Sequence, residues 1–178
     1  MSSSISLTDL ITLGRNRWTV PLLADLAGHG GGRFVELVHR LSISRDSLVR
    51  TLDAARDQGW IILNPGHGHP LRPEYVLTKQ GERLAGCAES IRIAQIGHGI
   101  APGTLTCWGL PLVHAIGHGH QRFNALARTL SPASPRALSQ GLQRLAGHEL
   151  VNRELLEGYP PTSRYWLTNK GEHLASGL

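Results

Sequence analysis

Apolar residues recur at helical spacing in the first part of the chain and predict three short helices in a row. The first covers residues 18–26 and ends in a glycine-rich loop, where glycine accepts the positive φ of a helix end. A second helix follows over residues 34–41. Ser44 is well placed to cap a third helix, whose apolar face runs through residues 48–55.

Two short apolar runs, residues 60–63 and 75–77, are typical of strands, and the Gly/Pro-rich loop between them suits a hairpin. Thr78 then opens a last helix that we expect to extend from Lys79 to about Ile96. An apolar stripe marks one side of this helix: Leu84, Cys87, Ile91 and Ala94. Two helices, a turn, a third helix, a two-stranded wing and a final helix form a winged helix-turn-helix.

The same pattern occurs twice. Residues 75–85 and 165–175 are identical at seven of eleven positions, at an offset of 90 residues. The same offset relates Trp18 to Trp108, and glycine and proline at residues 98–103 break any helix between the copies. The sequence therefore predicts two domains, residues 1–97 with the long linker helix and residues 104–178. The fold class is mainly α with small two-stranded β wings, a tandem winged helix-turn-helix.

The two copies differ in their last helix. In the first copy this helix is long, whereas the sequence ends at Leu178, soon after the matching helix starts. We expect an intramolecular pseudo-dimer, in which the linker helix of the first copy packs both halves together. Two separate domains on one chain, or a further homodimer of whole chains, are the alternatives.

Charge points to an anionic partner. The chain has 18 basic and 13 acidic residues, and its net charge is +5. Arginine supplies nearly all the basic residues, which suits phosphate and guanine contacts but equally reflects a GC-rich genome. No apolar run approaches the length of a membrane span, and the first residues do not resemble a signal peptide, so a cytoplasmic location is expected.

The third helix of each copy is the one that enters the major groove in this fold. In the second copy, with Leu138 facing the core, Arg136, Gln140 and Gln143 point the opposite way. Arg144 flanks them, and the wing carries two further candidates. The expected DNA contacts of the second copy are Arg136, Ser139, Gln140, Gln143, Arg144, Tyr159 and Arg164.

The first copy turns three carboxylates outward at the same place, those of Asp46, Asp53 and Asp57. Carboxylates that face phosphate repel it, so we expect the second copy to be the stronger DNA reader. The alternative is that Asp46 and Asp53 form surface ion pairs with Arg50 and Arg56. The candidate DNA contacts of the first copy are Arg45, Arg50 and Arg72.

Other residues suggest further chemistry. The histidine pairs 67/69 and 118/120 are interpreted as loop residues rather than metal ligands, because no carboxylate or thiol adjoins them. No catalytic arrangement stands out, and no cofactor, metal or enzymatic activity is expected. The four tryptophans are interpreted either as packing residues or as a pocket for a small-molecule effector. They are Trp18, Trp60, Trp108 and Trp166.

Several short motifs carry a family resemblance. They are Arg-Trp-Thr at residues 17–19, Arg-Phe-Val-Glu-Leu at 33–37, Ser-Pro-Arg-Ala-Leu-Ser-Gln at 134–140, Tyr-Pro-Pro at 159–161 and the two Tyr-x-Leu-Thr-x-x-Gly segments. In combination they resemble the HxlR-type winged-helix regulators. The resemblance implies a DNA-binding regulator, usually a homodimer with one such domain per chain. It also implies a redox-sensing cysteine upstream of the tryptophan near the N-terminus, a place that neither Cys87 nor Cys107 occupies.

These observations predict a sequence-specific regulator of transcription that binds double-stranded DNA, with the second repeat as the main reader. Two alternatives remain open. One is a protein that binds or sequesters small molecules on a degenerate regulator scaffold. The other is a DNA-binding protein of plasmid replication or partition.

Overall fold

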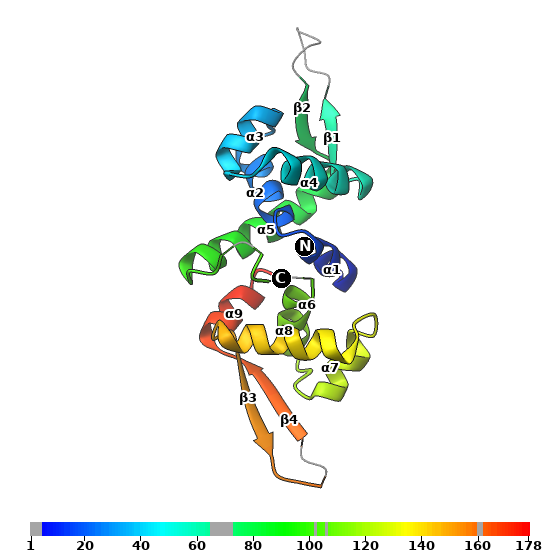
Figure 1. The fold of residues 1–178 in the computed structure, drawn as a ribbon, viewed down its shortest axis with the longest axis vertical. Helices are drawn as coiled ribbons and strands as arrows, with labels where there is room; N and C mark the ends of the chain where they lie inside the picture. The colour runs from blue at the N-terminus through cyan, green and yellow to red at the C-terminus, as the bar shows by residue number, and fades with distance from the viewer. Residues whose placement is uncertain (1–4, 65–72, 102, 106, 160–161) are drawn as a thin grey trace.

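The computed structural model describes residues 5–64, 73–101, 103–105, 107–159 and 162–178, and its elements form two helical units (Figure 1). In each unit a two-stranded hairpin, the wing, projects away from the other unit. The first unit contains α1 (Leu7–Arg15), α2 (Thr19–His29), α3 (Phe34–Leu41), α4 (Arg45–Asp57), β1 (Ile61–Asn64), β2 (Glu74–Leu77) and α5 (Lys79–Gly97). The second contains α6 (Gly109–Gly117), α7 (Phe123–Thr129), α8 (Pro135–Gly147), β3 (Val151–Leu156), β4 (Thr162–Leu167) and α9 (Asn169–Ala175).

The helix ends follow the signals in the sequence. The Ser44 hydroxyl accepts a hydrogen bond from the Ser47 amide at 3.3 Å, and Ser134 accepts one from Ala137 at 3.2 Å. Pro135 is the first residue of α8. Gly30 ends α2 with a φ of +71°, in the left-handed region. The predicted helices, caps and strands of both repeats are therefore confirmed.

The repeated Leu-Thr-x-x-Gly segment has a structural reason. Thr168 caps α9 by accepting from the Gly171 amide at 3.2 Å, and its own amide donates to the Leu150 carbonyl at 3.1 Å. That carbonyl lies so close to Gly171 that a Cβ atom there would overlap it. Thr78 and Gly81 make the same arrangement with the Trp60 carbonyl. The motif thus packs the base of each wing closely against the helix that follows it.

Each wing is an antiparallel pair of strands. In the first repeat Ile61 pairs with Leu77, and in the second Val151 pairs with Leu167. The described strands have six residues each in the second wing and four each in the first, whose residues 65–72 lie outside the described part of the chain. An isolated bridge between Arg122 and Arg164 ties the second wing to the start of α7.

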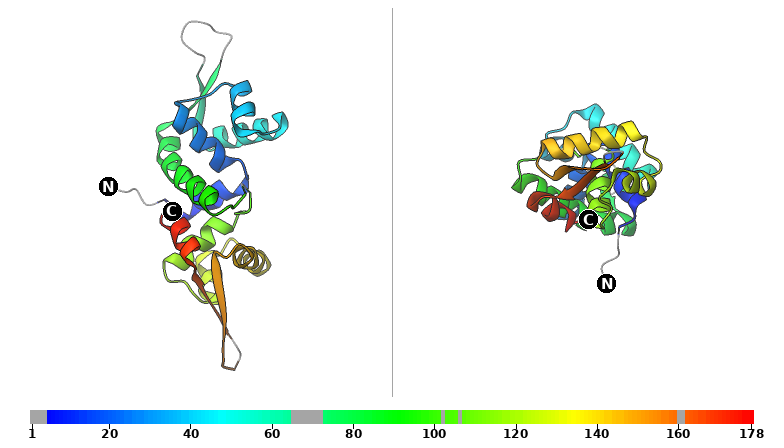
Figure 2. Two further views of the ribbon diagram at one scale, coloured as in Figure 1. Left: turned by 90° about the vertical axis from the view of Figure 1, so that its left-hand side faces the viewer. Right: turned by 90° about the horizontal axis from the view of Figure 1, so that it is seen from below.

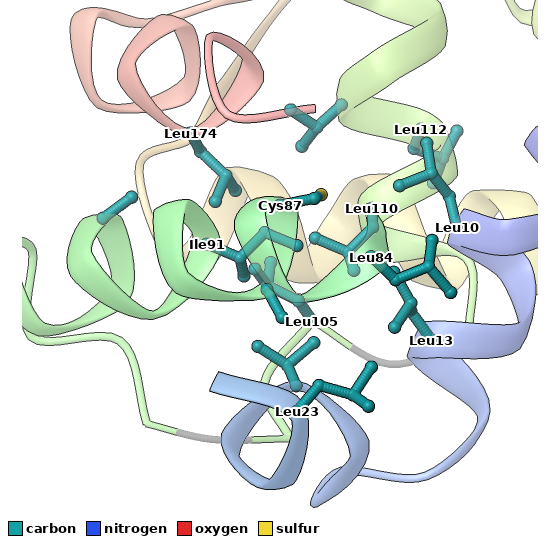
Figure 3. Packing of buried hydrophobic residues seen from close by; sticks show 14 of the residues in the cluster. Leu10, Leu13, Leu23, Leu84, Cys87, Ile91, Leu105, Leu110, Leu112 and Leu174 are labelled. Atoms are coloured by element: carbon teal, nitrogen blue, oxygen red, sulfur yellow. The ribbon is translucent and has the colours of Figure 1, made fainter. Parts of the chain in front are cut away.

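The two units share one core. The expected stripe of α5 is buried, and α5 packs on both α2 and α9. Leu10 and Leu13 come from α1, which the sequence pattern did not predict, and α1 packs on α6 of the second repeat. Figure 3 shows these side chains together with Leu105, Leu110 and Leu174. The halves therefore pack as a pseudo-dimer within one chain.

A polar contact also joins the two units. His98, which follows α5, lies 3.1 Å from His173 of α9, measured from Nε2 to Nδ1. The two rings meet edge to face with their centroids 5.2 Å apart. The end of the linker helix is thereby held against the last helix of the second repeat.

The third helices of the two repeats, α4 and α8, lie on the same side of the molecule. Both face the viewer in Figure 1, and both lie on the right in the left-hand view of Figure 2. The wings point to opposite ends of the long axis. Over the described residues, every helix is too short or too polar to serve as a membrane span.

Candidate nucleic-acid interface

Helix α8 presents a polar face to solvent. Leu138, Leu142 and Leu145 are buried on its inner side, at 3 % exposure or less. The five residues of this helix that the sequence nominated for DNA contact are all exposed: Arg136, Ser139, Gln140, Gln143 and Arg144. Their donors and acceptors are of the kinds that read base edges in the major groove.

A basic hollow of about 600 Å³ adjoins this face, between α7, α8 and the second wing. Arg122 and Arg128 line it from the side of α7, Arg153 lines it from β3, and Ser139 lines it from α8. Arg153 Nε donates to the Ser163 hydroxyl at 3.1 Å, which directs its guanidinium along the wing. Sequence reasoning missed these three arginines as site residues, because two come from α7 and its cap and one comes from β3, and only the fold brings them together.

The wing residues nominated from the sequence have different surroundings. Arg164 Nε donates to Gln121 Oε1 at 2.8 Å, so its side chain is held near the start of α7. Tyr159 is fully exposed beyond the end of β3. Arg72, the candidate in the first wing, lies outside the described residues. Arg45 and Arg50 of α4 are exposed.

The first repeat has a different surface at matching positions. Asp46 stands where Arg136 stands in α8, and Asp53 stands where Gln143 stands. Asp53 forms a 4.0 Å ion pair with Arg56, as the alternative interpretation expected. Arg50 instead donates to the Ser47 hydroxyl at 3.5 Å. One of the two expected surface ion pairs is therefore present.

The balance of charge differs sharply between the helix-turn-helix segments of the two repeats, which are called the reading units below. Residues 118–148 contain four arginines and no carboxylate, whereas the matching residues 29–58 contain five arginines and four carboxylates. In the first unit Arg40 forms an ion pair with Asp25, with 2.7 Å between Nη2 and Oδ2. The second unit therefore carries the stronger positive potential toward a polyanion.

Exposed apolar side chains add to the difference. Val35, Val49 and Leu63 of the first repeat are 68 %, 45 % and 41 % exposed. In the second repeat these positions hold Asn124, Ser139 and Arg153, all of which line the basic hollow. An alignment of the two repeats in the sequence could have predicted this contrast.

The four tryptophans are dispersed. Trp60 is buried at 3 % exposure below the start of α5. Trp18 lines a hollow between α2 and α5, and Trp166 lines a different one beside α6 and α9. Trp108 packs partly buried against the core at the start of α6. The four tryptophans therefore do not line one shared pocket, although Trp18 borders a separate hollow.

The two cysteines are in different environments. Burial raises the pKa of the Cys87 thiol to about 12, so it stays protonated at neutral pH. Cys107 is half-buried, and its sulfur lies 3.9 Å from the Ile11 carbonyl oxygen. Among the described residues, no three side chains of His, Cys, Asp or Glu are grouped closely enough to hold a metal ion.

Two winged helix-turn-helix units with exposed polar third helices define this protein as a tandem winged helix-turn-helix protein. The family profile described as HxlR-like helix-turn-helix matches residues 13–95 and again residues 106–178. The chain belongs to this family and contains its domain twice.

Relatives are transcriptional regulators by name. The chain is 31 % identical over 67 residues to the HTH-type transcriptional regulator YodB of Bacillus subtilis (strain 168), covering 38 % of this chain and 60 % of that protein. It is 34 % identical over 68 residues to the uncharacterized HTH-type transcriptional regulator YtfH of Escherichia coli (strain K12), covering 38 % and 54 %. The chain thus spans between about half and three fifths of the length of these relatives. The crystal structure of diamide-treated YodB matches with 30 % identity and a TM-score of 0.37, over 39 % of this chain and 68 % of that one.

Proposed function

We propose that this protein is a sequence-specific regulator of transcription in which the second repeat reads DNA and the first repeat contributes little base recognition. The observation that supports this most directly is the carboxylate-free reading unit, residues 118–148, against the acidic face of α4. Phosphate contacts dominate the affinity of such proteins, so an acidic face weakens binding wherever it meets the backbone.

In this proposal α8 lies in the major groove. Arg136 reaches a guanine edge through two hydrogen bonds, and Gln140 and Gln143 offer the paired donor and acceptor that suit adenine. Arg122, Arg128 and Arg153 hold backbone phosphates in the basic hollow, where guanidinium forks match phosphate oxygens. The exposed wing with Tyr159 and Arg164 follows the backbone or the minor groove.

The working unit in this proposal is one chain, with domains at residues 1–97 and 104–178. The shared core between α1, α5, α6 and α9 supports it. In a homodimer of single-domain chains such contacts would join two chains, whereas here they join the two repeats of one chain. Size-exclusion chromatography with light scattering tests the point. A mass near 19.3 kDa is expected, and a mass near twice that value would require a dimer of pseudo-dimers.

The DNA-binding test begins with selection of binding sites from random duplex DNA, followed by footprinting. On the selected site, at fixed salt, Arg136→Ala should weaken binding by about 10- to 100-fold, since a good bidentate base contact is worth roughly 1–3 kcal/mol. Arg50→Ala, the control in the first repeat, should change affinity by less than about twofold. Equal losses in the two variants would refute the unequal division of labour.

Salt dependence separates base contacts from phosphate contacts. Arg128→Ala should weaken binding to selected and unselected DNA alike and should lower the slope of log K against log salt by about one. Arg136→Ala should instead reduce the preference for the selected site. A chain that fails to enrich any sequence would contradict sequence-specific binding altogether.

A further inference from the structure

The first repeat contains a hollow of about 650 Å³ that the DNA-reading surface does not use. It lies between α2 and α5, which run side by side (Figure 2), and it reaches the end of α3. Its walls are largely apolar and include Trp18, Pro21, Leu41, Ile96 and Ile100. Its volume falls within the range of sites that bind drug-sized molecules.

One polar side chain opens into this hollow without a partner. Gln95 is 6 % exposed and lines the hollow, and among the described residues its amide makes no hydrogen bond. No side-chain nitrogen or oxygen of the described residues is both fully enclosed and unpartnered, so the Gln95 amide touches the open space. An amide that faces this space can exchange a hydrogen bond to water for one to the donor or acceptor of a ligand.

The charged groups around the hollow are already neutralised. Arg40 donates to the Asp25 carboxylate through Nε and Nη2, at 3.0 and 2.7 Å to Oδ2. Arg92 forms a two-point contact with Glu89, at 2.7 and 2.6 Å. Neither arginine is left free for an anionic ligand, and neither carboxylate is left free for a cationic one. The chemistry of the walls therefore favours an uncharged occupant.

We propose that this hollow binds a neutral, flat, mainly aromatic molecule that bears one hydrogen-bonding group, which pairs with the Gln95 amide. Trp18 supplies an aromatic wall, and Ile96 and Ile100 cover the apolar body of the ligand. The site is specific to the first repeat, because His114 and His118 of the second repeat occupy the positions of Ala24 and Gly28. The proposal does not depend on which repeat reads DNA.

The location gives such a ligand a route to regulation. Leu41 ends α3, only a short turn before α4, and Gln95 belongs to α5, which also packs on α9 of the second repeat. A bound molecule therefore contacts both the reading unit of the first repeat and the helix that joins the two repeats. Ligand and DNA affinity are coupled if these two elements move relative to one another.

The binding test uses the full chain and the uncharged dye N-phenyl-1-naphthylamine, whose fluorescence rises in an apolar site. One dye should bind per chain. Ala27→Phe places a ring at the rim of the hollow from an exposed helix position and should weaken binding at least tenfold. Ala54→Phe, an exposed alanine of α4, is the matched control and should bind as the parent does. Loss of binding in both variants, or in neither, would overturn the assignment.

The role of Gln95 needs a second probe. The hydrocarbon 1-benzylnaphthalene has nearly the shape of the dye but a CH2 group in place of the N–H group, and its affinity is measured by displacement of the dye. The parent chain should prefer the amine by about fivefold, the worth of one net hydrogen bond. Gln95→Leu keeps the site apolar and should abolish this preference while it still binds the hydrocarbon. A preference that survives in Gln95→Leu would refute the pairing, whereas the DNA-binding experiments above are unaffected by either result.

Discussion

Gly81 and its repeat partner Gly171 provide the sharpest test of the wing-to-helix junction. A Cβ at residue 81 would overlap the Trp60 carbonyl, which cannot withdraw freely because it accepts from the Thr78 amide at 2.9 Å. Overpacking against fixed backbone costs up to about 3 kcal/mol. Alanine in a helix returns about 1 kcal/mol of propensity, so Gly81→Ala should destabilise the fold by about 2 kcal/mol.

Gly86→Ala is the matched control. Gly86 lies on the same helix, and a Cβ there would meet no atom within 4 Å. This variant should gain about 1 kcal/mol, because it keeps the propensity and avoids the overlap. Thermal unfolding by circular dichroism should then show Gly81→Ala melting about 4–8 °C below the parent and Gly86→Ala about 2–4 °C above it. A Gly81→Ala melting temperature equal to or above that of Gly86→Ala would refute the argument.

Three further predictions concern packing, capping and thiol chemistry. Ile91→Ala in the shared core should cost about 3 kcal/mol, whereas Ile93→Ala, on the exposed side of α5, should cost under about 0.5 kcal/mol in urea denaturation. Ser134→Ala removes the cap of α8 and should lower the free energy of unfolding by about 1 kcal/mol in the same assay. Because burial keeps the pKa of Cys87 near 12, iodoacetamide at pH 8 should modify only Cys107 in the native chain, and both thiols in urea.

The elements that could be predicted are those with local causes. Apolar spacing and the serine caps located α4 and α8, because a helix with its own cap and face needs no distant partner to be recognised. Helix α1 was missed although Ser6 and Asp9 form a capping box at its start. Its apolar face, Leu10 and Leu13, packs on the other repeat, so its stability is a tertiary effect.

The candidate site divides in the same way. Helical periodicity alone indicated which side chains of α8 face solvent. The basic hollow could not be read from any one segment, because Arg122, Arg128 and Arg153 are separated by up to 31 residues and meet only when the wing folds back on α7. The sequence also offered no reason to single out Gln95, because a glutamine on a helix is normally exposed to solvent.

Fusion of the two repeats changes what the DNA target can look like. A homodimer of identical domains has equal recognition helices, so its operator mirrors its two-fold symmetry. Here α4 and α8 lie on one side of a single chain. Yet Asp46 is exposed at the position of Arg136, and Val49 is exposed at the position of Ser139. Because each head is encoded separately, neither constrains the other. The operator of such a chain has no need to be palindromic, and its sequence information should be concentrated beneath α8.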